Sequence, residues 1–257
     1  VALDPRDAHK TTFITRRGSF QFNVLPFGLC NAPATFERLM DLVLNGLNYE
    51  VCLVYLDDII VFSTDLDTHL IRLERLFIRL ESAGLKLKPS KCHLMQRQVL
   101  FLGHIINPNG ISTDPEKIEA VRTWPTPGHL RGLRAFIGLC SYYRRYVKDF
   151  AKVAEPLHAM TRKNQKFQWN SRCEEAFQQL KSALMTAPLL ALPKDGDEYL
   201  LDTDASDVGL GVVLSKVNEG DERPIAFASR LCSPAERNYN VTRRELLAVI
   251  FGLKIFR

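Results

Sequence analysis

The chain has 257 residues, of which 46% are hydrophobic and 25% charged, with 14 glycines and 13 prolines. These values are ordinary for globular proteins, so they exclude a disordered chain, a collagen-like repeat and a fibrous protein. The formal net charge of +5 permits a polyanionic partner without requiring one. The length allows one large domain or two of ordinary size.

The positive charge is concentrated in one stretch of the chain. Residues 111–168 carry 11 Lys and Arg against 5 Asp and Glu, whereas residues 1–110 carry 12 against 11 and residues 169–257 carry 11 against 13. Such an asymmetry indicates a local binding function.

The cysteines and the two ends of the chain exclude several classes. Neighbouring cysteines are at least 22 residues apart, which excludes a zinc knuckle or a redox Cys-x-x-Cys pair and favours a reducing compartment. No apolar run approaches the length of a membrane span, and we expect no signal peptide. The chain begins with Val rather than Met and ends inside an apolar helical pattern, so we expect a fragment of a longer protein.

Hydrophobic periodicity predicts alternating strands and helices in the first part of the chain. The predicted helix at 31–47 carries an apolar face that we interpret as part of the hydrophobic core. The expected elements are a strand at 19–25, a helix at 31–47 capped by Asn31, two buried strands within 51–62 joined at Asp57-Asp58, and a helix from Asp67 that ends at Gly84.

The second part begins with an apolar segment and a turn that favours a hairpin, followed by helices in the basic stretch and then by strands. A capping box is predicted at the start of the fourth helix and another at the start of the last. The expected elements are a hairpin within 99–112 around Asn107–Gly110, helices at 114–121, 130–140, 154–161 and 171–187, strands within 198–217 and 223–229, and a helix from Thr242.

Two adjacent acids, Asp57 and Asp58, lie between the two most apolar predicted strands. Adjacent carboxylates repel one another, and a purely structural turn would favour Asn-Gly or Asp-Gly. A divalent cation removes the repulsion, because Mg²⁺ takes carboxylate oxygens together with substrate phosphates. The alternative is an exposed acidic turn without a ligand.

The tetrad Tyr55-Leu56-Asp57-Asp58 at this predicted hairpin tip resembles the reverse transcriptases of Gypsy-type (Metaviridae) long-terminal-repeat retrotransposons. Other segments of the chain resemble the same family in the same order. They are Leu25–Leu29 with Asn31–Phe36, Phe101–His104, Phe136–Leu139 with Tyr142–Arg145, Thr203–Ser206 and Arg244–Ala248. The resemblance covers nearly the whole chain.

The resemblance implies an α+β fold with three regions. They are a polymerase palm with an antiparallel sheet and helices at 1–112, a helical thumb and connection at 113–166, and an RNase H-like α/β domain at 167–257. The palm is expected to be truncated at its N-terminus and the RNase H-like domain at its C-terminus. The third polymerase carboxylate and the later RNase H acids are then expected outside the chain.

The resemblance also implies roles for single residues of the palm. Asp57 and Asp58 are expected to hold metal and to be catalytic, and Lys91 is expected to be a general acid toward pyrophosphate, with a solvated or phosphate-facing Lys as the alternative. The residues expected to contact the nucleotide or the primer are Tyr55, Phe27, Gly28, Phe101, Leu102 and Gly103.

For the RNase H-like region, the resemblance implies that Asp204 and Glu245 are catalytic metal ligands. Strand alternation puts Asp202 on the same face as Asp204, and these acids could also form a solvated surface. Thr242 and Glu245 have the spacing of a capping box, which is the structural alternative for Glu245.

The basic stretch is expected to bind duplex phosphates through Arg131, Arg134, Arg144, Arg145 and Lys148, with Lys152 nearby. Helical spacing places several of these side chains on shared faces. A solvated helix face is the alternative.

Taken together, the resemblance implies an RNA-directed DNA polymerase fragment of a retrotransposon polyprotein, with an associated RNase H endonuclease. Each active site would use two Mg²⁺ ions, with Mn²⁺ as an alternative. The implied partners are an RNA template, a DNA primer, an RNA–DNA hybrid, deoxynucleoside triphosphates and other Pol and Gag parts, without a membrane. The implied location is intracellular, in a cytoplasmic virus-like particle or the nucleus. The rival hypothesis is a catalytically dead or co-opted nucleic-acid-binding remnant of a retroelement.

Overall fold

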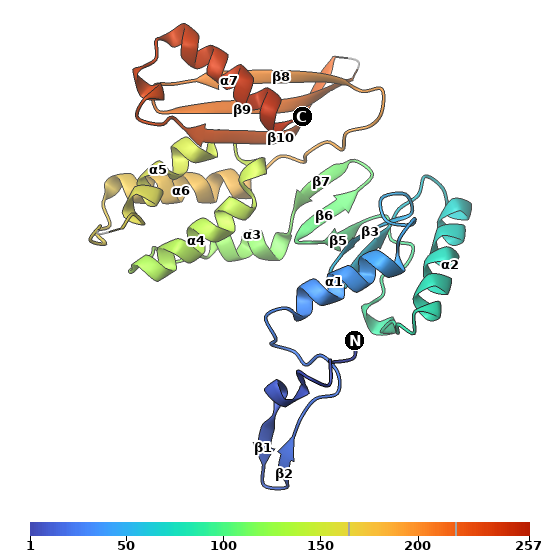
Figure 1. The fold of residues 1–257 in the computed structure, drawn as a ribbon. Helices are drawn as coiled ribbons and strands as arrows, with labels where there is room; N and C mark the ends of the chain where they lie inside the picture. The colour runs from blue at the N-terminus through green and yellow to red at the C-terminus, as the bar shows by residue number, and fades with distance from the viewer. Residues whose placement is uncertain (164, 219) are drawn as a thin grey trace. The chain divides into compact units, whose positions relative to one another are not determined.

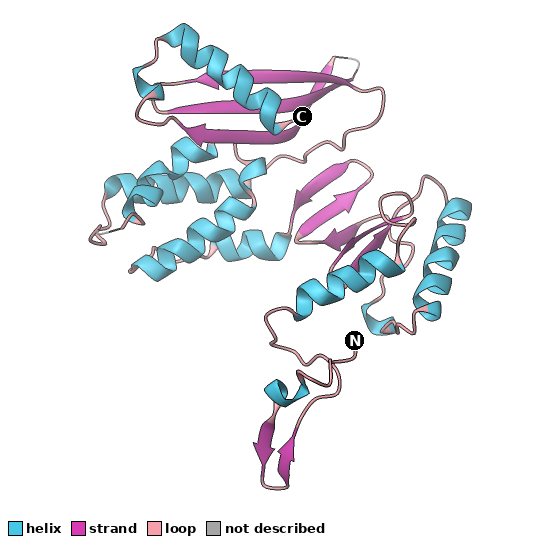
Figure 2. Ribbon diagram, viewed as in Figure 1, coloured by secondary structure: helices cyan, strands magenta, loops and turns pink. Residues whose placement is uncertain are grey.

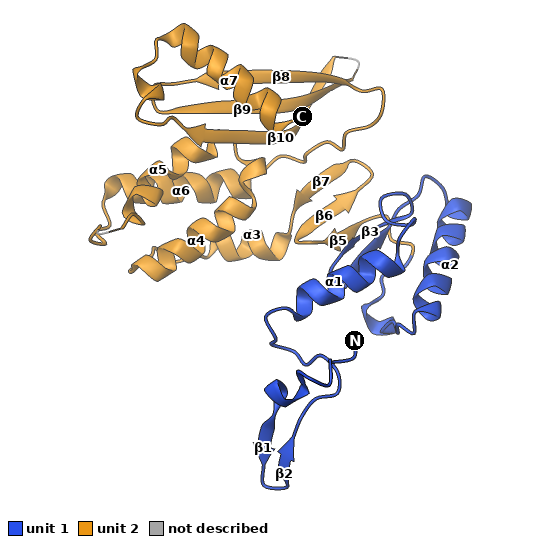
Figure 3. Cartoon of the chain, viewed as in Figure 1, with its two compact units in different colours: residues 1–94 blue, residues 95–257 orange. Residues whose placement is uncertain are grey.

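The computed structural model describes residues 1–163, 165–218 and 220–257, and these residues form two compact units, Val1–Leu94 and Met95–Arg257 (Figure 3). Helices and antiparallel strands occur in both units (Figure 2). Each unit is described by itself below.

The first unit contains two hairpins and two long helices (Figure 1). Its core is formed where α1 and α2 cover the β3–β4 hairpin, with Met40, Leu44 and Leu80 buried. The elements are η1 (Ala8–Thr11), β1 (Phe13–Thr15), β2 (Gly18–Phe20), α1 (Ala32–Val43), β3 (Cys52–Tyr55), β4 (Asp58–Val61), α2 (Leu66–Ser82) and η2 (Pro89–Lys91).

The predicted elements of this unit are largely confirmed, with three corrections. The strand predicted at 19–25 ends at Phe20. Asn31 precedes α1, but its side chain makes no capping hydrogen bond, because its backbone is already helical. The second helix begins at Leu66, since the Asp65 carboxylate accepts a hydrogen bond from the Thr68 N–H at 2.8 Å and caps it.

The second unit begins with a three-stranded antiparallel sheet, continues with a helical bundle, and ends with a second three-stranded sheet that α7 covers (Figure 1). Its elements are β5 (Val99–Phe101), β6 (His104–Asn107), β7 (Gly110–Thr113), α3 (Pro115–Arg122), α4 (Leu130–Tyr142), η3 (Arg144–Tyr146), α5 (Phe150–Met160), α6 (Ser171–Met185), β8 (Glu198–Ala205), β9 (Gly209–Asn218), β10 (Asp221–Leu231), η4 (Glu236–Asn238) and α7 (Val241–Ile255).

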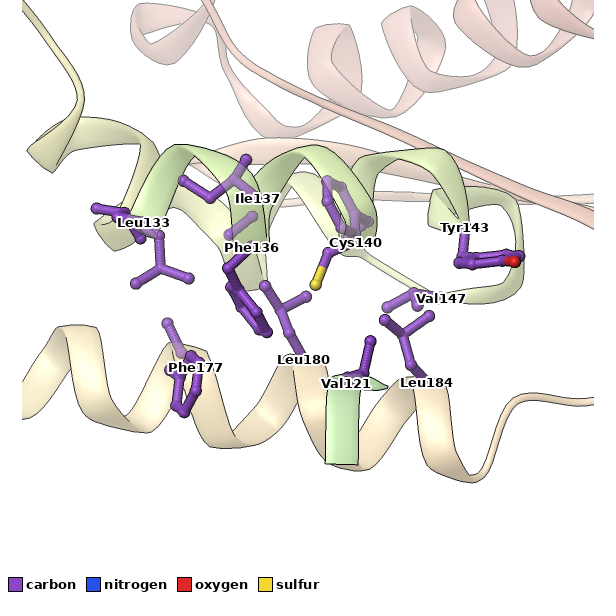
Figure 4. Close-up of a cluster of buried hydrophobic side chains, with 14 of the residues drawn as sticks. Val121, Leu133, Phe136, Ile137, Cys140, Tyr143, Val147, Phe177, Leu180 and Leu184 are labelled. Carbon is purple, nitrogen blue, oxygen red and sulfur yellow. The ribbon is translucent and has the colours of Figure 1, made fainter. Parts of the chain in front are cut away.

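The helical bundle has the most extensive core in the unit (Figure 4). Phe136 and Cys140 of α4 and Phe177 and Leu180 of α6 are buried there, and the Phe136 and Phe177 rings lie 4.5 Å apart. Helix α6 packs against α3 and α5 in this bundle. Fully buried side chains of this size contribute about 1.5–3 kcal/mol each.

The sheet order β10-β9-β8 places β9 in the centre. Helix α7 packs on one face, where Leu201 and Val212 contact Gly252 so closely that a side chain there would have to displace them. Helix α5 and η3 pack against β10, and the Ala151 N–H donates to the Ser229 hydroxyl at 2.9 Å. The bundle and this sheet are therefore joined through α5.

The predicted turn at Asn107–Gly110 is confirmed, since it joins β6 to β7. The structure corrects the prediction elsewhere in this unit. Residues 99–106 of the predicted hairpin contain a second turn, at Leu102-Gly103. Helix α5 begins at Phe150, before the predicted start at 154. Neither predicted capping box forms. Asn170 caps α6 and Asn240 caps α7, because each side chain accepts a hydrogen bond from the backbone N–H three residues on.

Candidate functional site

Asp57 and Asp58 lie at the tip of the β3–β4 hairpin, and both are exposed. Tyr55 pairs with Asp58, so the two-residue turn is Leu56-Asp57 and Asp58 begins β4. The predicted turn was therefore one residue too late. The shift occurs because Leu56 adopts a left-handed conformation, φ 54°, which the sequence does not indicate. Tyr55 is 54% exposed beside the acids.

Helix α1 contacts this turn directly. The Leu56 N–H donates a hydrogen bond to the Glu37 carboxylate, and both residues are half-buried. Because a charged acceptor makes a stronger hydrogen bond than a neutral one, Glu37 fixes the turn that carries the two acids. No sequence pattern indicates this contact, since the two residues are 19 positions apart.

The remaining predicted palm residues of the first unit are exposed. Phe27 is fully exposed, and Gly28 has φ 95°, a conformation that favours glycine. Phe27 and its loop neighbours Leu25, Pro26 and Leu29 line a cavity of about 440 Å³ together with Phe22, and Gly28 is not among the lining residues. Lys91 ends η2 with an exposed side chain.

The turn predicted to contact the primer, Leu102-Gly103, is held by aromatic residues of the helical bundle. The Tyr142 hydroxyl donates to the Leu102 carbonyl, and the Tyr143 hydroxyl donates to the Gly103 carbonyl at 2.7 Å. His104 follows the turn, and its Nδ1 lies 2.9 Å from the Tyr146 hydroxyl.

Burial shifts the pKa of three of these groups, Tyr143, Tyr146 and His104. Burial raises the pKa of Tyr143 and of Tyr146 to about 12. Burial, and to a smaller extent the charge of Arg145, lowers the pKa of His104. Sequence reasoning singled out Tyr142 and Tyr143 as part of a motif but did not predict that they contact the turn.

The five residues predicted to bind duplex phosphates and the nearby Lys152 are exposed: Arg131, Arg134, Arg144, Arg145, Lys148 and Lys152. Within the described residues none of them forms an ion pair, whereas Arg230 pairs with Glu236 at 2.8 Å and Arg162 with Glu155 at 3.7 Å. Exposed cations without acidic partners are available to phosphates.

Asp204 lies near the end of β8, on the face opposite α7. Ala205 packs with Leu247 against the α7 side, so alternation turns Asp204 and Asp202 to the other face. Both acids line a cavity of about 450 Å³, together with Lys148, Asp149 and Glu222. Gly211 lies beside it, and a side chain at this position would have to displace the Asp149 carboxylate.

Glu245 lies in the second turn of α7 and is half-buried. The capping-box alternative for Glu245 is wrong, because Asn240 caps this helix instead. Glu245 is not among the described residues that line the cavity beside Asp204. The neighbouring Arg244 has two buried guanidinium nitrogens, Nε and Nη1, without a hydrogen-bond partner in the described structure.

The donor sets fit a divalent cation only in part. Asp57 and Asp58 supply oxygen ligands of the type that Mg²⁺ takes, usually with one or two carboxylates and the rest from water and phosphate. Across residues 1–163, 165–218 and 220–257, no group of three or more His, Cys, Asp or Glu side chains is arranged to hold a metal ion. No described helix is both long and apolar enough to cross a membrane.

Comparison with known proteins decides the family. Residues 1–106 match the reverse transcriptase (RNA-dependent DNA polymerase) family, and residues 169–257 match the RNase H-like domain found in reverse transcriptase. The retrovirus-related Pol polyproteins from the Drosophila melanogaster transposons 297 and gypsy are 40% and 35% identical to the chain over 100% and 98% of its length. The chain belongs to the Gypsy-type Pol family.

This Pol segment spans 24% and 25% of the length of those two relatives. Its fold is that of a foamy viral protease–reverse transcriptase solved in complex with double-stranded DNA, with a TM-score of 0.86 and 24% identity over 98% of this chain and 44% of that one. The expected α+β fold class, palm and thumb followed by an RNase H-like domain, is confirmed. Domains of the two matched families generally use divalent metal ions.

Proposed function

We propose that this Pol segment belongs to an RNA-directed DNA polymerase that extends a primer 3′-hydroxyl, with an associated RNase H endonuclease that cleaves RNA in RNA–DNA hybrids. One observation carries the proposal. Two adjacent exposed carboxylates, Asp57 and Asp58, stand at the tip of a hairpin inside the segment that matches the reverse transcriptase family.

Asp57 and Asp58 would hold the divalent metal of the polymerase site, Mg²⁺ or Mn²⁺. The chemistry that a metal pair would supply there is charge stabilisation for an in-line phosphoryl transfer. Tyr55 lies beside the acids and would pack at the primer terminus, while Phe27 and Gly28 would border the incoming nucleotide. Lys91 would donate a proton to pyrophosphate, since its ammonium is exposed.

Duplex binding falls to the second unit. The unpaired cations Arg131, Arg134, Arg144, Arg145 and Lys148 would contact phosphates, which holds a template–primer without reading its sequence. The turn Phe101–Gly103 would contact the primer. In the RNase H-like region, Asp204 and Glu245 would be metal ligands, and the side chain of Glu245 is not used for capping.

The family supports a wider context for the molecule. We propose that template RNA, DNA primer and deoxynucleoside triphosphates are its substrates and that other Pol and Gag parts are its partners, in an intracellular virus-like particle. A remnant without catalysis would keep the basic duplex surface but would not depend on Asp57.

The experiment is primer extension on an RNA template by the Pol protein that carries this chain, with Asp57→Asn as the matched control. We expect Asp57→Asn to reduce extension by more than about 100-fold, because it removes a charged metal ligand but leaves the shape. Charge reversal at Arg144 and Arg145 should instead weaken duplex binding and lower the salt slope by about 1 for each contact. Duplex binding without extension in the unaltered protein would favour the remnant.

A further inference from the structure

The Leu102-Gly103 turn and the residue after it are held by hydrogen bonds to one short segment, Tyr142–Tyr146. The two carbonyls of the turn accept hydrogen bonds from Tyr142 and Tyr143, and the residue that follows, His104, reaches Tyr146. The two segments are about 40 positions apart in the chain. Every polar contact is made by a tyrosine hydroxyl, so a single oxygen can be removed without changing the ring.

Stacking adds to these hydrogen bonds. The His104 ring lies 5.4 Å from Tyr142 and 5.7 Å from Tyr146 in stacked geometry, and 5.5 Å from Tyr143 edge to face. Tyr143 is completely buried, and its hydroxyl is satisfied by the Gly103 carbonyl. A buried hydroxyl without that acceptor would be unfavourable, so the turn and the tyrosine hold each other in place.

The backbone of the turn itself needs this support. Leu102 has φ 48° and Gly103 has φ 67°, so both residues adopt the left-handed conformation. This conformation is unfavourable for leucine, because unlike glycine it carries a Cβ. The Tyr143 hydroxyl and the Tyr142 ring lie 3.4–3.6 Å from the position that a Cβ on Gly103 would take. The tyrosines thus select one conformation of a turn that is otherwise unfavourable.

The same segment also carries two of the phosphate-binding candidates. Arg144 and Arg145 lie between Tyr143 and Tyr146 in the chain. The two arginines are exposed, whereas the two tyrosines are buried. Two exposed arginines are therefore flanked by two buried tyrosines. The tyrosines hold the segment to the turn, and the arginines remain accessible to a duplex backbone.

We propose that Tyr142, Tyr143 and Tyr146 are positioning residues that fix the Leu102-Gly103 turn to the basic segment of Arg144 and Arg145, so that the primer terminus and the duplex phosphates are held by one rigid body. The proposal rests on the proposed function, because it takes the turn to contact the primer. The tyrosines do not touch the primer; they act through the turn.

The experiment compares two probes bound by the 257-residue chain in fluorescence anisotropy. One is a labelled DNA duplex with a recessed 3′ end, and the other is the same duplex closed by hairpin loops at both ends, which has no primer terminus. The variants are Tyr142→Phe and Tyr143→Phe, each of which loses only a hydroxyl. Tyr199→Phe is the matched control, because its hydroxyl also donates to a backbone carbonyl, that of Lys194 at 3.0 Å, elsewhere in the same unit.

We expect the unaltered chain to prefer the recessed end. Tyr142→Phe and Tyr143→Phe should each reduce that preference by about twofold to tenfold, the range for one hydrogen bond, and leave affinity for the closed duplex unchanged. Deuterium uptake of residues 99–107 should rise in both variants and stay the same in Tyr199→Phe. Tyr142 is 52% exposed, so its variant folds even if the buried Tyr143 variant does not.

The outcomes separate the two ideas. A preference that survives in both tyrosine variants overturns the positioning role and leaves the proposed function intact. An equal loss for both probes overturns it as well, because that result indicates only general destabilisation. If the unaltered chain binds both probes equally, the primer assignment of the turn fails, and the positioning role fails with it.

Discussion

The molecule contains two hairpin turns that share a backbone device but are anchored by opposite means. Leu56-Asp57 joins β3 to β4 and Leu102-Gly103 joins β5 to β6, each as a two-residue turn with a left-handed leucine in first place. In the first turn a backbone N–H is held by the carboxylate of Glu37. In the second, two carbonyls are held by tyrosine hydroxyls.

The difference in anchor matches the charge around each turn. The first turn carries Asp57 and leads directly into Asp58, and its anchor Glu37 is also an acid, so the residues at this turn suit a cation. The second turn is anchored by tyrosine hydroxyls from the segment that also carries Arg144 and Arg145, and exposed cations suit phosphate. A left-handed leucine costs about 1–2 kcal/mol, so each turn depends on its anchor to persist.

Among substitutions outside the expected metal ligands, removing Glu37, the anchor of the first turn, should have the largest effect, and the effect should be on primer extension. We expect Glu37→Ala to reduce primer extension about 10-fold to 100-fold, as losses of groups that orient metal ligands do. Glu37→Gln should retain most of the rate, because its amide oxygen can still accept from Leu56. The measurement is single-turnover extension, with Mn²⁺ affinity by electron paramagnetic resonance as a second readout.

Asp41→Ala is the matched control, since Asp41 is an exposed carboxylate on the same helix α1. Equal losses in Glu37→Gln and Glu37→Ala would show that the charge of Glu37, rather than its hydrogen bond to the turn, is what matters. No loss in either variant would mean that the first turn holds its shape without an anchor.

The same comparison explains how far the sequence predicts this structure. Alternation and helical spacing predict β3, β4 and the apolar face of α1, because burial of apolar side chains determines them. The position of both turns was missed, by one residue at Asp57 and entirely at Gly103. Both turns begin with a leucine, which local propensity does not place in a left-handed turn.

The anchors were missed for a further reason. Glu37 and Tyr143 reach their turns across 19 and 40 residues, and such contacts leave no periodic pattern in the sequence. Capping was predicted at the wrong residues for a related reason. Asn170 and Asn240 each precede a Ser or Thr motif that suggested a cap, and the backbone geometry selects the asparagine.

Substituting the glycine of the second turn should have a moderate effect. We expect Gly103→Ala to lower the free energy of unfolding of the second unit by about 1–2 kcal/mol, because alanine resists a φ of 67°. Gly138→Ala is the control within α4, where nothing lies within 4 Å of the added methyl. Gly138→Ala should raise the free energy of unfolding by about 0.5–1 kcal/mol, since alanine is a better helix former than glycine. Urea denaturation of both variants measures the difference, and two changes of the same sign would contradict the assignment of the turn.

The smallest expected effect is a pH dependence that only the second turn should show. His104 is packed among Tyr142, Tyr143 and Tyr146, and burial, followed by the charge of Arg145, lowers its pKa from the ordinary value of 6.5. The unfolded chain therefore binds a proton more readily than the folded one. Neutral His104 makes its full contribution to the free energy of unfolding above about pH 6.5, and this contribution is lost as the pH falls below that value.

We expect deuterium uptake of residues 99–107, corrected for intrinsic exchange, to rise between pH 7.5 and pH 5.5. Residues 51–62 serve as the internal reference from the first turn. His158 also has a pKa lowered mainly by burial, so global stability falls in the same window, and only a local readout isolates His104. His104→Phe keeps a ring for stacking and cannot titrate, so uptake at 99–107 should then follow the reference. A persistent rise in His104→Phe would assign the pH dependence to His158 and leave both turns equally insensitive to acid.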